Sequence, residues 1–227
     1  VRRAMAQLGY EPNFQASNLA TQNSRAIGII LPPSEREAFE NPFYLEAIRG
    51  ISQFCNKRQY SNTVITGRDD QEILQVIRTM TRSGQVDGFI LLYSRQKDPI
   101  VDYLYSEGLL YVLIGKAYQF ANQTIYIDND NLLAGREAAE YLYGLGHRRI
   151  AYIGSDIRLM FSADRRSGCQ LALLEKGLSL RPEYFAEVHS LSEAGEAPIR
   201  QLLQLAERPT AVIVSDDILA VALERVC

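Results

Sequence analysis

Short apolar runs alternate with longer amphipathic segments from residue 26 to the end of the chain. Polar residues rarely interrupt the short runs, which is the pattern expected of strands that helices cover on both sheet faces. We therefore predict seven strands, at Ala26–Leu31, Ser61–Thr66, Gly88–Tyr93, Leu110–Ile114, Thr124–Ile127, Ile150–Gly154 and Ala211–Val214.

Segments with helical spacing separate these predicted strands. In one of them Ile73, Ile77 and Met80 recur near the 3.6-residue period, and a preceding aspartate can cap its first turn. Because strands and helices alternate, the sequence predicts an α/β fold with parallel sheets and with ligand sites at the carboxyl ends of strands. The predicted helices are Pro42–Arg58, Asp70–Ser83, Pro99–Glu107, Asn131–Leu145, Ser162–Lys176, Ala197–Leu205 and Ile218–Val226.

The first 25 residues have a different pattern. Residues 1–9 fit the end of a helix that stops at Gly9, and Pro12 can open a second, short polar helix. We predict three regions: residues 1–25, a first lobe at residues 26–146 and a second lobe at residues 147–227. The boundary between the lobes is placed at Gly144–His147, because a new strand begins directly after it.

Composition excludes several classes of protein. No run approaches the ~20 apolar residues of a membrane helix, and the first residues lack the apolar core of a signal peptide. The three cysteines are widely spaced without a CxxC pair, which is typical of a reducing cytosol, and two histidines cannot build a zinc site alone. We expect no metal ion, no cofactor and no membrane association.

Charge is distributed unevenly along the chain. The net charge of the whole chain is −3, which is not typical of a nucleic-acid-binding domain. Residues 1–25 carry three arginines and one glutamate, a balance of +2, which leaves −5 for the remaining residues. A basic tip on an acidic body indicates that only the tip contacts phosphates, although a solvated helix end would have the same composition.

Five segments together resemble the lactose-repressor family of transcription factors. They are Tyr10–Leu19 with its Tyr-x-Pro-Asn hinge, Asn41–Gly50, Val86–Ile90, Leu145–Gly154 and Ala211–Asp217. Asn-Pro-Phe-Tyr at residues 41–44, Gly88–Ser94 and Ile127–Asn131 look most like the maltose-regulon repressor branch. The resemblance implies a two-lobed core like that of periplasmic binding proteins, preceded by the hinge helix of a helix-turn-helix head. Family members carry more helices before this point and a further segment after it, so the resemblance also implies a partial chain with an incomplete second lobe.

The resemblance implies a DNA-contacting role for the short helix after Pro12. Leu19 would be an apolar wedge that unstacks a base step in the minor groove of the operator. Asn13, Ala16 and Ser17 would face the backbone or the groove edge, although family members often carry arginine where Ser17 stands. The alternative is a flexible linker with an ordinary leucine.

Candidate effector-binding residues follow the predicted strands or open the predicted helices. Sugar pockets combine aromatic faces with planar polar groups that bind pairs of hydroxyls. Arg165 matches the family's pocket arginine, which precedes a glycine by three residues. The full set of candidates is Phe43, Tyr44, Tyr93, Ser94, Asp128, Arg165 and Asp216.

Each candidate also has an ordinary structural interpretation. Phe43 and Tyr44 could fill the core, the two aspartates could cap the helices that follow them, and Arg165 could pair with Asp164 or Glu175.

Two other classes of protein remain as alternatives. For an enzyme, the chain lacks a P-loop, a GxGxxG after a strand, a GxSxG elbow and an HExxH pair. A sugar-binding transport receptor would share the fold but not the hinge. We therefore expect a cytoplasmic, homodimeric repressor of carbohydrate genes that binds operator DNA and responds to maltose or a related glucoside.

Overall fold

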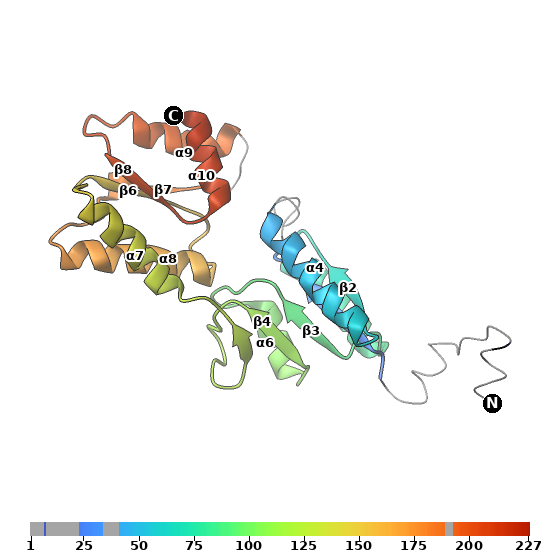
Figure 1. Cartoon of the computed structure of the whole chain (residues 1–227). Coiled ribbons are helices and arrows are strands. Elements are labelled where there is room, and N and C mark those ends of the chain that lie inside the picture. Colours follow the sequence, from blue (N-terminus) through green and yellow to red (C-terminus); the bar gives the residue numbers. More distant parts are fainter. Residues whose placement is uncertain (1–6, 8–22, 34–40, 189–192) are drawn as a thin grey trace. The chain divides into compact units, whose positions relative to one another are not determined.

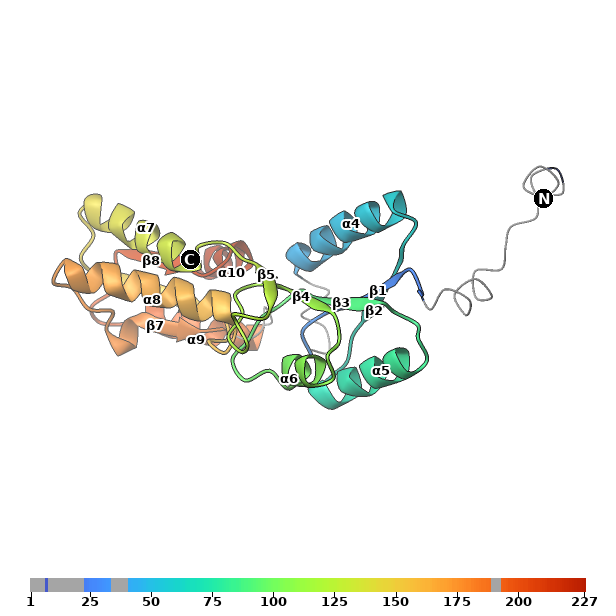
Figure 2. The same ribbon diagram turned by 90° about the horizontal axis from the view of Figure 1, so that it is seen from below.

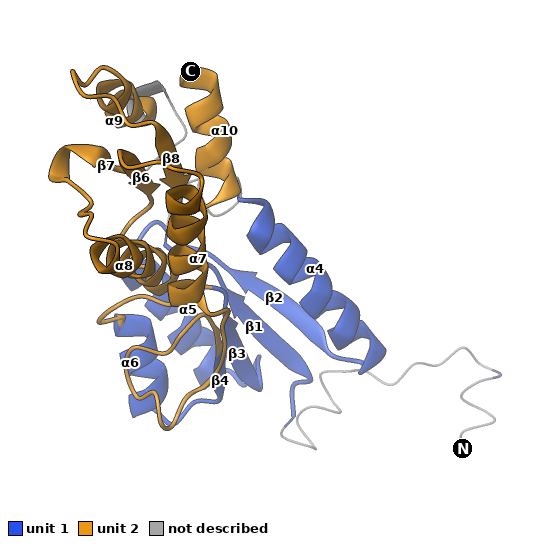
Figure 3. Ribbon diagram, turned by 60° about the vertical axis from the view of Figure 1, so that its left-hand side comes forward, with its two compact units in different colours: residues 1–92, 99–112 blue, residues 93–98, 113–227 orange. Residues whose placement is uncertain are grey.

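The computed structural model describes residue 7 and residues 23–33, 41–188 and 193–227. The chain divides into two compact units, Val1–Leu92 with Pro99–Val112, and Tyr93–Asp98 with Leu113–Cys227 (Figure 3). The lobe boundary at Gly144–His147 stays a prediction. The two compact units do not follow this predicted boundary, because helix α7 (Asn131–Gly144) belongs to the same unit as the elements that follow it.

The larger sheet has five strands in the order β2-β1-β3-β4-β5. β1 pairs in parallel with both β2 and β3, with Ala26 opposite Ser61 at the start of the first pair. The strands are β1 (Ala26–Ile30), β2 (Ser61–Ile65), β3 (Gly88–Leu91), β4 (Tyr111–Ile114) and β5 (Ile125–Ile127). β1 has a hydrogen-bonded neighbour on each side, and this interior position in the sheet explains why its apolar run is unbroken.

Helices cover both faces of the strands in the first unit. Helix α4 (Pro42–Lys57) lies over one face of β1, β2 and β3, and helices α5 (Asp70–Arg82) and α6 (Pro99–Ser106) lie over the other (Figure 2). Ile73 and Ile77 of α5 are fully buried, as their spacing predicts. Asp69 caps this helix by accepting hydrogen bonds from the amides of Gln71 and Glu72 at 2.9 Å.

The second unit is built on a three-stranded parallel sheet in the order β7-β6-β8. Its strands are β6 (Ile150–Gly154), β7 (Phe185–Glu187) and β8 (Ala211–Val214). Helices α7 and α8 (Met160–Glu175) cover one face, and α9 (Glu193–Leu203) and α10 (Asp217–Val226) cover the other (Figure 1). A 3-10 turn, η1 (Pro182–Tyr184), precedes β7.

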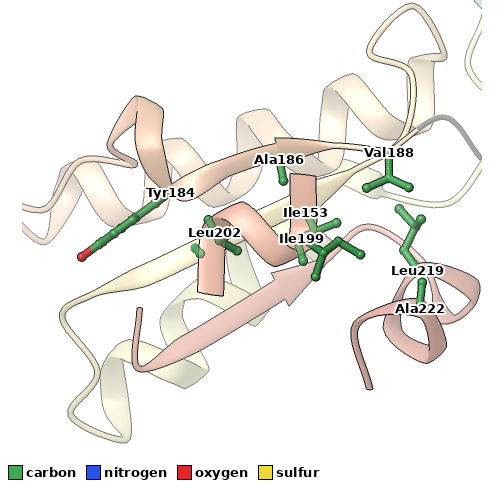
Figure 4. Packing of buried hydrophobic residues seen from close by; sticks show 9 residues of the cluster. Ile153, Tyr184, Ala186, Val188, Ile199, Leu202, Leu219 and Ala222 are labelled. Atoms are coloured by element: carbon green, nitrogen blue, oxygen red, sulfur yellow. The ribbon is translucent and has the colours of Figure 1, made fainter. Parts of the chain in front are cut away.

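Two apolar clusters lie on opposite faces of the central strand β6. Ile153 packs with Ala186, Ile199 and Leu219 beneath α9 and α10 (Figure 4). On the other face, under α7 and α8, the cluster is Ala139, Ile150, Tyr152, Cys169, Ala172, Leu173 and Ile213. The two-sided burial of β6 follows from its position at the centre of the sheet.

Two glycines allow α7 and α8 to approach closely. A Cβ atom added at Gly135 would lie 1.9 Å from the Arg165 carbonyl oxygen, and one added at Gly168 would lie 1.9 Å from the Leu132 carbonyl oxygen. Backbone therefore contacts backbone at this crossing, and no larger residue fits at either position. The close approach brings the first turn of α7 alongside the first turns of α8.

The α/β fold class predicted from the sequence is confirmed, and all seven predicted strands and seven predicted helices are present. Strand β7 and the turn before it were not predicted, because three residues are too short to show a period. The predicted start of α9 at Ala197 is wrong: the helix begins at Glu193 and contains Pro198 in its interior. Among the described residues, no helix is long and apolar enough to cross a membrane, and no group of three acidic, histidine or cysteine side chains could hold a metal ion.

Candidate functional site

Arg165 lies at the centre of a polar network in the second unit. Its Nε donates to the Oδ1 of Asn131 at 2.9 Å, and its Nη1 donates to the carbonyl oxygen of Ser215. The Phe161 ring lies 5.2 Å from the guanidinium carbon. Arg165 is on α8, Asn131 is the first residue of α7, and Ser215 follows β8, so three elements together fix the guanidinium plane.

Asn131 also holds Asp128. The Nδ2 of Asn131 donates to the Oδ1 of Asp128 at 2.9 Å and to the carbonyl oxygen of Asn129 at 3.2 Å. The cap of α7 is Asp130, whose carboxylate accepts from the amide of Leu133 at 2.9 Å. The capping role considered for Asp128 is therefore filled by its neighbour, and the Asp128 carboxylate is available for another use.

Surrounding protein atoms raise the pKa of Asp128 above its ordinary value by desolvating the carboxylate. The negative charge of Asp164 acts in the same direction. The amides of Asn129 and Asn131 and the charge of Lys116 oppose this increase. Desolvation is the largest of these effects, but Asp128 is an exposed residue, so the cost of ionising it in the folded protein is small.

A lysine and an aspartate adjoin this network. Lys116 Nζ lies 2.9 Å from Asp164 Oδ2, and this hydrogen bond raises the pKa of Lys116. The backbone around Lys116 is fixed by Ser94, whose hydroxyl donates to the Lys116 carbonyl oxygen. The Ser94 carbonyl in turn accepts from the amide of Met160 at 2.9 Å. Buried Ser94 thus joins the segment after β4 to the start of α8.

Asp216 is a helix cap. Its Oδ1 accepts from the amide of Leu219 at 2.9 Å, and its Oδ2 accepts from the Ser215 hydroxyl at 3.0 Å. The structural role considered for Asp216 is therefore observed. Because Ser215 contacts both Asp216 and Arg165, the cap also fixes the carbonyl that holds the guanidinium.

The ion pairs considered for Arg165 are made by other residues. Asp164 pairs with Lys116, and Glu175 pairs with Arg136, whose Nη1 lies 2.7 Å from the Glu175 carboxylate. Arg165 instead binds an amide oxygen and a carbonyl oxygen. Within the described part of the chain, its Nη2 has no hydrogen-bond partner, and the side chain is partly exposed.

The aromatic candidates have different environments. On α4 of the first unit, Tyr44 is buried, whereas Phe43 is 52% exposed, and their rings meet edge to face with centroids 5.4 Å apart. Core packing therefore accounts for Tyr44 and not for Phe43. Tyr93, in the second unit, is also buried, with the Arg95 guanidinium 5.8 Å from its ring centroid.

The structure thus connects Asp128, Arg165 and Asp216, and it joins Ser94 to Lys116 in the same unit. Sequence reasoning did not propose Asn131, Lys116 or Ser215 as site residues, and it named Asp164 only as a possible ion-pair partner of Arg165. Gly168, three residues after Arg165, is compatible with a close helix contact, but sequence spacing does not show that the facing helix is the one that begins at Asn131. The predicted DNA-contacting residues, Asn13, Ala16, Ser17 and Leu19, lie outside the described residues.

Parallel sheets with helices on both faces, and a polar network at the carboxyl ends of strands, define the class of the periplasmic-binding-protein-like receptors. A family model described as periplasmic binding proteins and sugar binding domain of LacI family matches residues 24–226. The chain belongs to this family.

Similar proteins agree with this assignment. The transcriptional regulator MalR of Streptococcus pneumoniae is 34% identical over 229 residues, which cover the whole chain and 68% of MalR. A LacI-type regulator structure from Bacillus cereus subsp. cytotoxis has a TM-score of 0.85 at 36% identity, over 90% of this chain and 72% of that one. A complex of the regulator CelR with cellobiose has a TM-score of 0.81 at 28% identity. The match covers 99% of this chain and 66% of the CelR chain.

Proposed function

We propose that this chain is the effector-sensing part of a cytoplasmic, homodimeric repressor of carbohydrate-utilisation genes. In this proposal a small sugar binds at the Arg165 network and controls the affinity of the protein for operator DNA. Relatives that are named as transcriptional regulators support the regulatory role over a role in transport, and we assign no catalytic reaction to the site.

The prearranged guanidinium of Arg165 is the observation that carries the proposal. Asn131 and Ser215 occupy two of its donors and fix its plane, and Arg165 as a residue is partly exposed. A planar fork of N–H groups is suited to a pair of neighbouring sugar hydroxyls. Asp128 adds a carboxylate acceptor on the other side of Asn131. Donor and acceptor groups are therefore held in fixed positions, as a polyhydroxylated ligand requires.

The charges of the network favour an uncharged ligand. Lys116 and Arg165 contribute two positive charges, and Lys116 is already neutralised by Asp164. Asp128 and Asp216 are further carboxylates of the network. A net charge of −1 over these five side chains would oppose a sugar phosphate. We therefore infer a neutral sugar.

The relatives narrow the class of sugar. A structural neighbour of 26% identity is titled as a probable maltose operon transcriptional repressor, and CelR was solved with cellobiose, which like maltose is a disaccharide of glucose. We infer maltose or a related glucoside as the effector. Phe43, Tyr44, Tyr93 and Ser94 remain candidate contacts alongside Asp128, Arg165 and Asp216. For operator DNA, the candidate contacts remain Asn13, Ala16 and Ser17, with Leu19 as the wedge.

Isothermal calorimetry tests the effector proposal. We expect maltose or another neutral glucoside to bind and glucose 6-phosphate not to bind. Arg165→Ala should weaken glucoside binding by about 10- to 100-fold, the usual range for hydrogen bonds to a charged group. Arg158→Ala is the matched control, since Arg158 is an exposed arginine of the same unit that pairs with Asp156. Equal glucoside affinity in the Arg165→Ala and wild-type proteins would remove Arg165 from the site.

A further inference from the structure

Asn131 is the shared partner of the two side chains expected to contact the effector. Its side chain is 3% exposed, and it uses both ends of the amide. The oxygen accepts from Arg165 Nε at 2.9 Å, and the nitrogen donates to Asp128 Oδ1 at 2.9 Å and to the Asn129 carbonyl oxygen at 3.2 Å. Only one orientation of the amide satisfies a donor on one side and two acceptors on the other.

The backbone around Asn131 restricts it to this position. Asn131 lies one helical turn before Gly135, and Arg165 lies three residues before Gly168. These two glycines form the backbone contacts that bring α7 against α8. The close helix contact therefore holds the backbone of Asn131 near Arg165, and the side-chain amide of Asn131 bridges the guanidinium and the Asp128 carboxylate.

We propose that Asn131 is a positioning residue that couples Arg165 to Asp128, so that a fixed donor fork and a fixed acceptor face the sugar together. This inference rests on the proposed function for its effect on sugar binding. The coupling itself is a property of the unliganded protein and can be measured without a sugar.

Asn131→Asp tests the coupling because it keeps the shape and the acceptor for Arg165 and removes the donor to Asp128. Two carboxylates would then face each other at hydrogen-bonding distance, and they cannot both ionise there without strong repulsion. The pair should share a proton with a raised apparent pKa. The charged groups around it are Arg165 and Asp164 from α8, Lys116 from the segment after β4, and Asp216 before α10.

The pH dependence of sugar binding should reverse in this variant. In the wild-type protein, acidification protonates Asp128 and weakens binding, because the charged acceptor is replaced by a weaker neutral one. In Asn131→Asp, maltose affinity should fall by about tenfold or more at pH 7.5. It should recover toward the wild-type value near pH 5, where the shared proton restores the missing donor. A purely structural role for Asn131 would not reverse the slope.

Two further variants complete the experiment. Asn131→Leu keeps the branching at Cγ and loses all three hydrogen bonds, so its maltose affinity should be low at both pH values. Asn122→Asp, an exposed change of the same chemistry in the same unit, should leave the wild-type profile unchanged. If Asn131→Leu folds and binds maltose as wild type does, the positioning role is wrong.

Carboxyl-carbon NMR titration without sugar separates this inference from the proposed function. In Asn131→Asp, two coupled carboxyl titrations should appear, one with a pKa well above that of Asp128 in the wild-type protein. Two independent titrations near ordinary values would overturn the coupling whatever sugar the protein binds. Coupled titrations in a protein that binds neither maltose nor cellobiose would retain the coupling and count against the proposed effector.

Discussion

The two units differ in what holds their helices. In the first unit, α5 is held by fully buried isoleucines and by a good aspartate cap. In the second, α7 and α8 meet at two glycines, and Leu159 at the N-cap of α8 makes no side-chain hydrogen bond to the helix. The second unit gives up local stabilisation where it brings its polar groups together. Functional sites commonly carry such a cost.

The largest expected effect comes from filling the glycine contact. Gly168→Ala would place its Cβ 1.9 Å from the Leu132 carbonyl oxygen, which is rigid backbone. The helices must separate, so we expect a loss of about 3 kcal/mol or more, at the upper end of overpacking costs. The loss in the free energy of unfolding would be measured by urea denaturation. Amide hydrogen exchange of the β6 residues would show whether the loss falls in the second unit. Maltose affinity should fall as well, because Arg165 moves away from Asn131.

Gly50→Ala in the first unit is the matched control. Gly50 lies within α4, is exposed, and has no atom within 4 Å of an added Cβ. Alanine should therefore stabilise the helix by about 0.5–1 kcal/mol. If Gly168→Ala and Gly50→Ala changed the free energy of unfolding equally, the close helix contact in the second unit would not distinguish the two units.

The contrast between apolar packing in the first unit and the glycine contact in the second also explains which features could be predicted from the sequence. The apolar runs of β1 and β6 and the spacing of Ile73 and Ile77 are one-dimensional signals, and they predicted the strands, the helices and the fold class. Arg165 could be proposed because a family pattern contains it. Asn131 could not, because its role depends on a backbone contact between two helices, and sequence spacing does not show which helix faces which.

Helix caps show a second limit. An aspartate before a helix predicts a cap, and Asp69 and Asp216 are caps. The segment Asp128-Asn129-Asp130 offers two aspartates for one cap position, and the sequence cannot choose between them. The structure assigns the cap to Asp130, which leaves Asp128 to Asn131.

A smaller effect is expected at Tyr152, which is 1% exposed under α8. Within the described residues its hydroxyl has no hydrogen-bond partner, and burial raises the pKa of the phenol. Removing an unpaired buried hydroxyl recovers part of its desolvation cost. Tyr152→Phe should therefore stabilise the second unit by about 1 kcal/mol, measured as a higher urea midpoint.

Tyr184→Phe is the control for this change. Tyr184 is similarly buried in the same unit, but its hydroxyl donates to the Glu207 carbonyl oxygen at 2.8 Å. Its loss should cost about 1 kcal/mol, so the two tyrosine variants should shift the urea midpoint in opposite directions. A loss of stability in Tyr152→Phe would show that the Tyr152 hydroxyl has a hydrogen-bond partner. The second unit would then not carry the cost of burying an unpaired hydroxyl group.

The smallest effect concerns pH, and its sign should differ between the units. Asp128 has a raised pKa in the folded protein, so its ionisation opposes folding above that pKa. Asp128→Asn should then be more stable than wild type at pH 7, and this gain should vanish below about pH 3, where Asp128 is protonated in both the folded and the unfolded state. In the first unit, Arg68 lowers the pKa of Glu72, so Glu72→Gln should be less stable at pH 7 and equal to wild type in acid. Urea midpoints at about pH 3 and at pH 7 would measure both differences. A stabilised Asp128→Asn protein that binds maltose less tightly would show that the carboxylate is kept for the effector at the expense of the fold, whereas two variants with the same sign would contradict the contrast between the units.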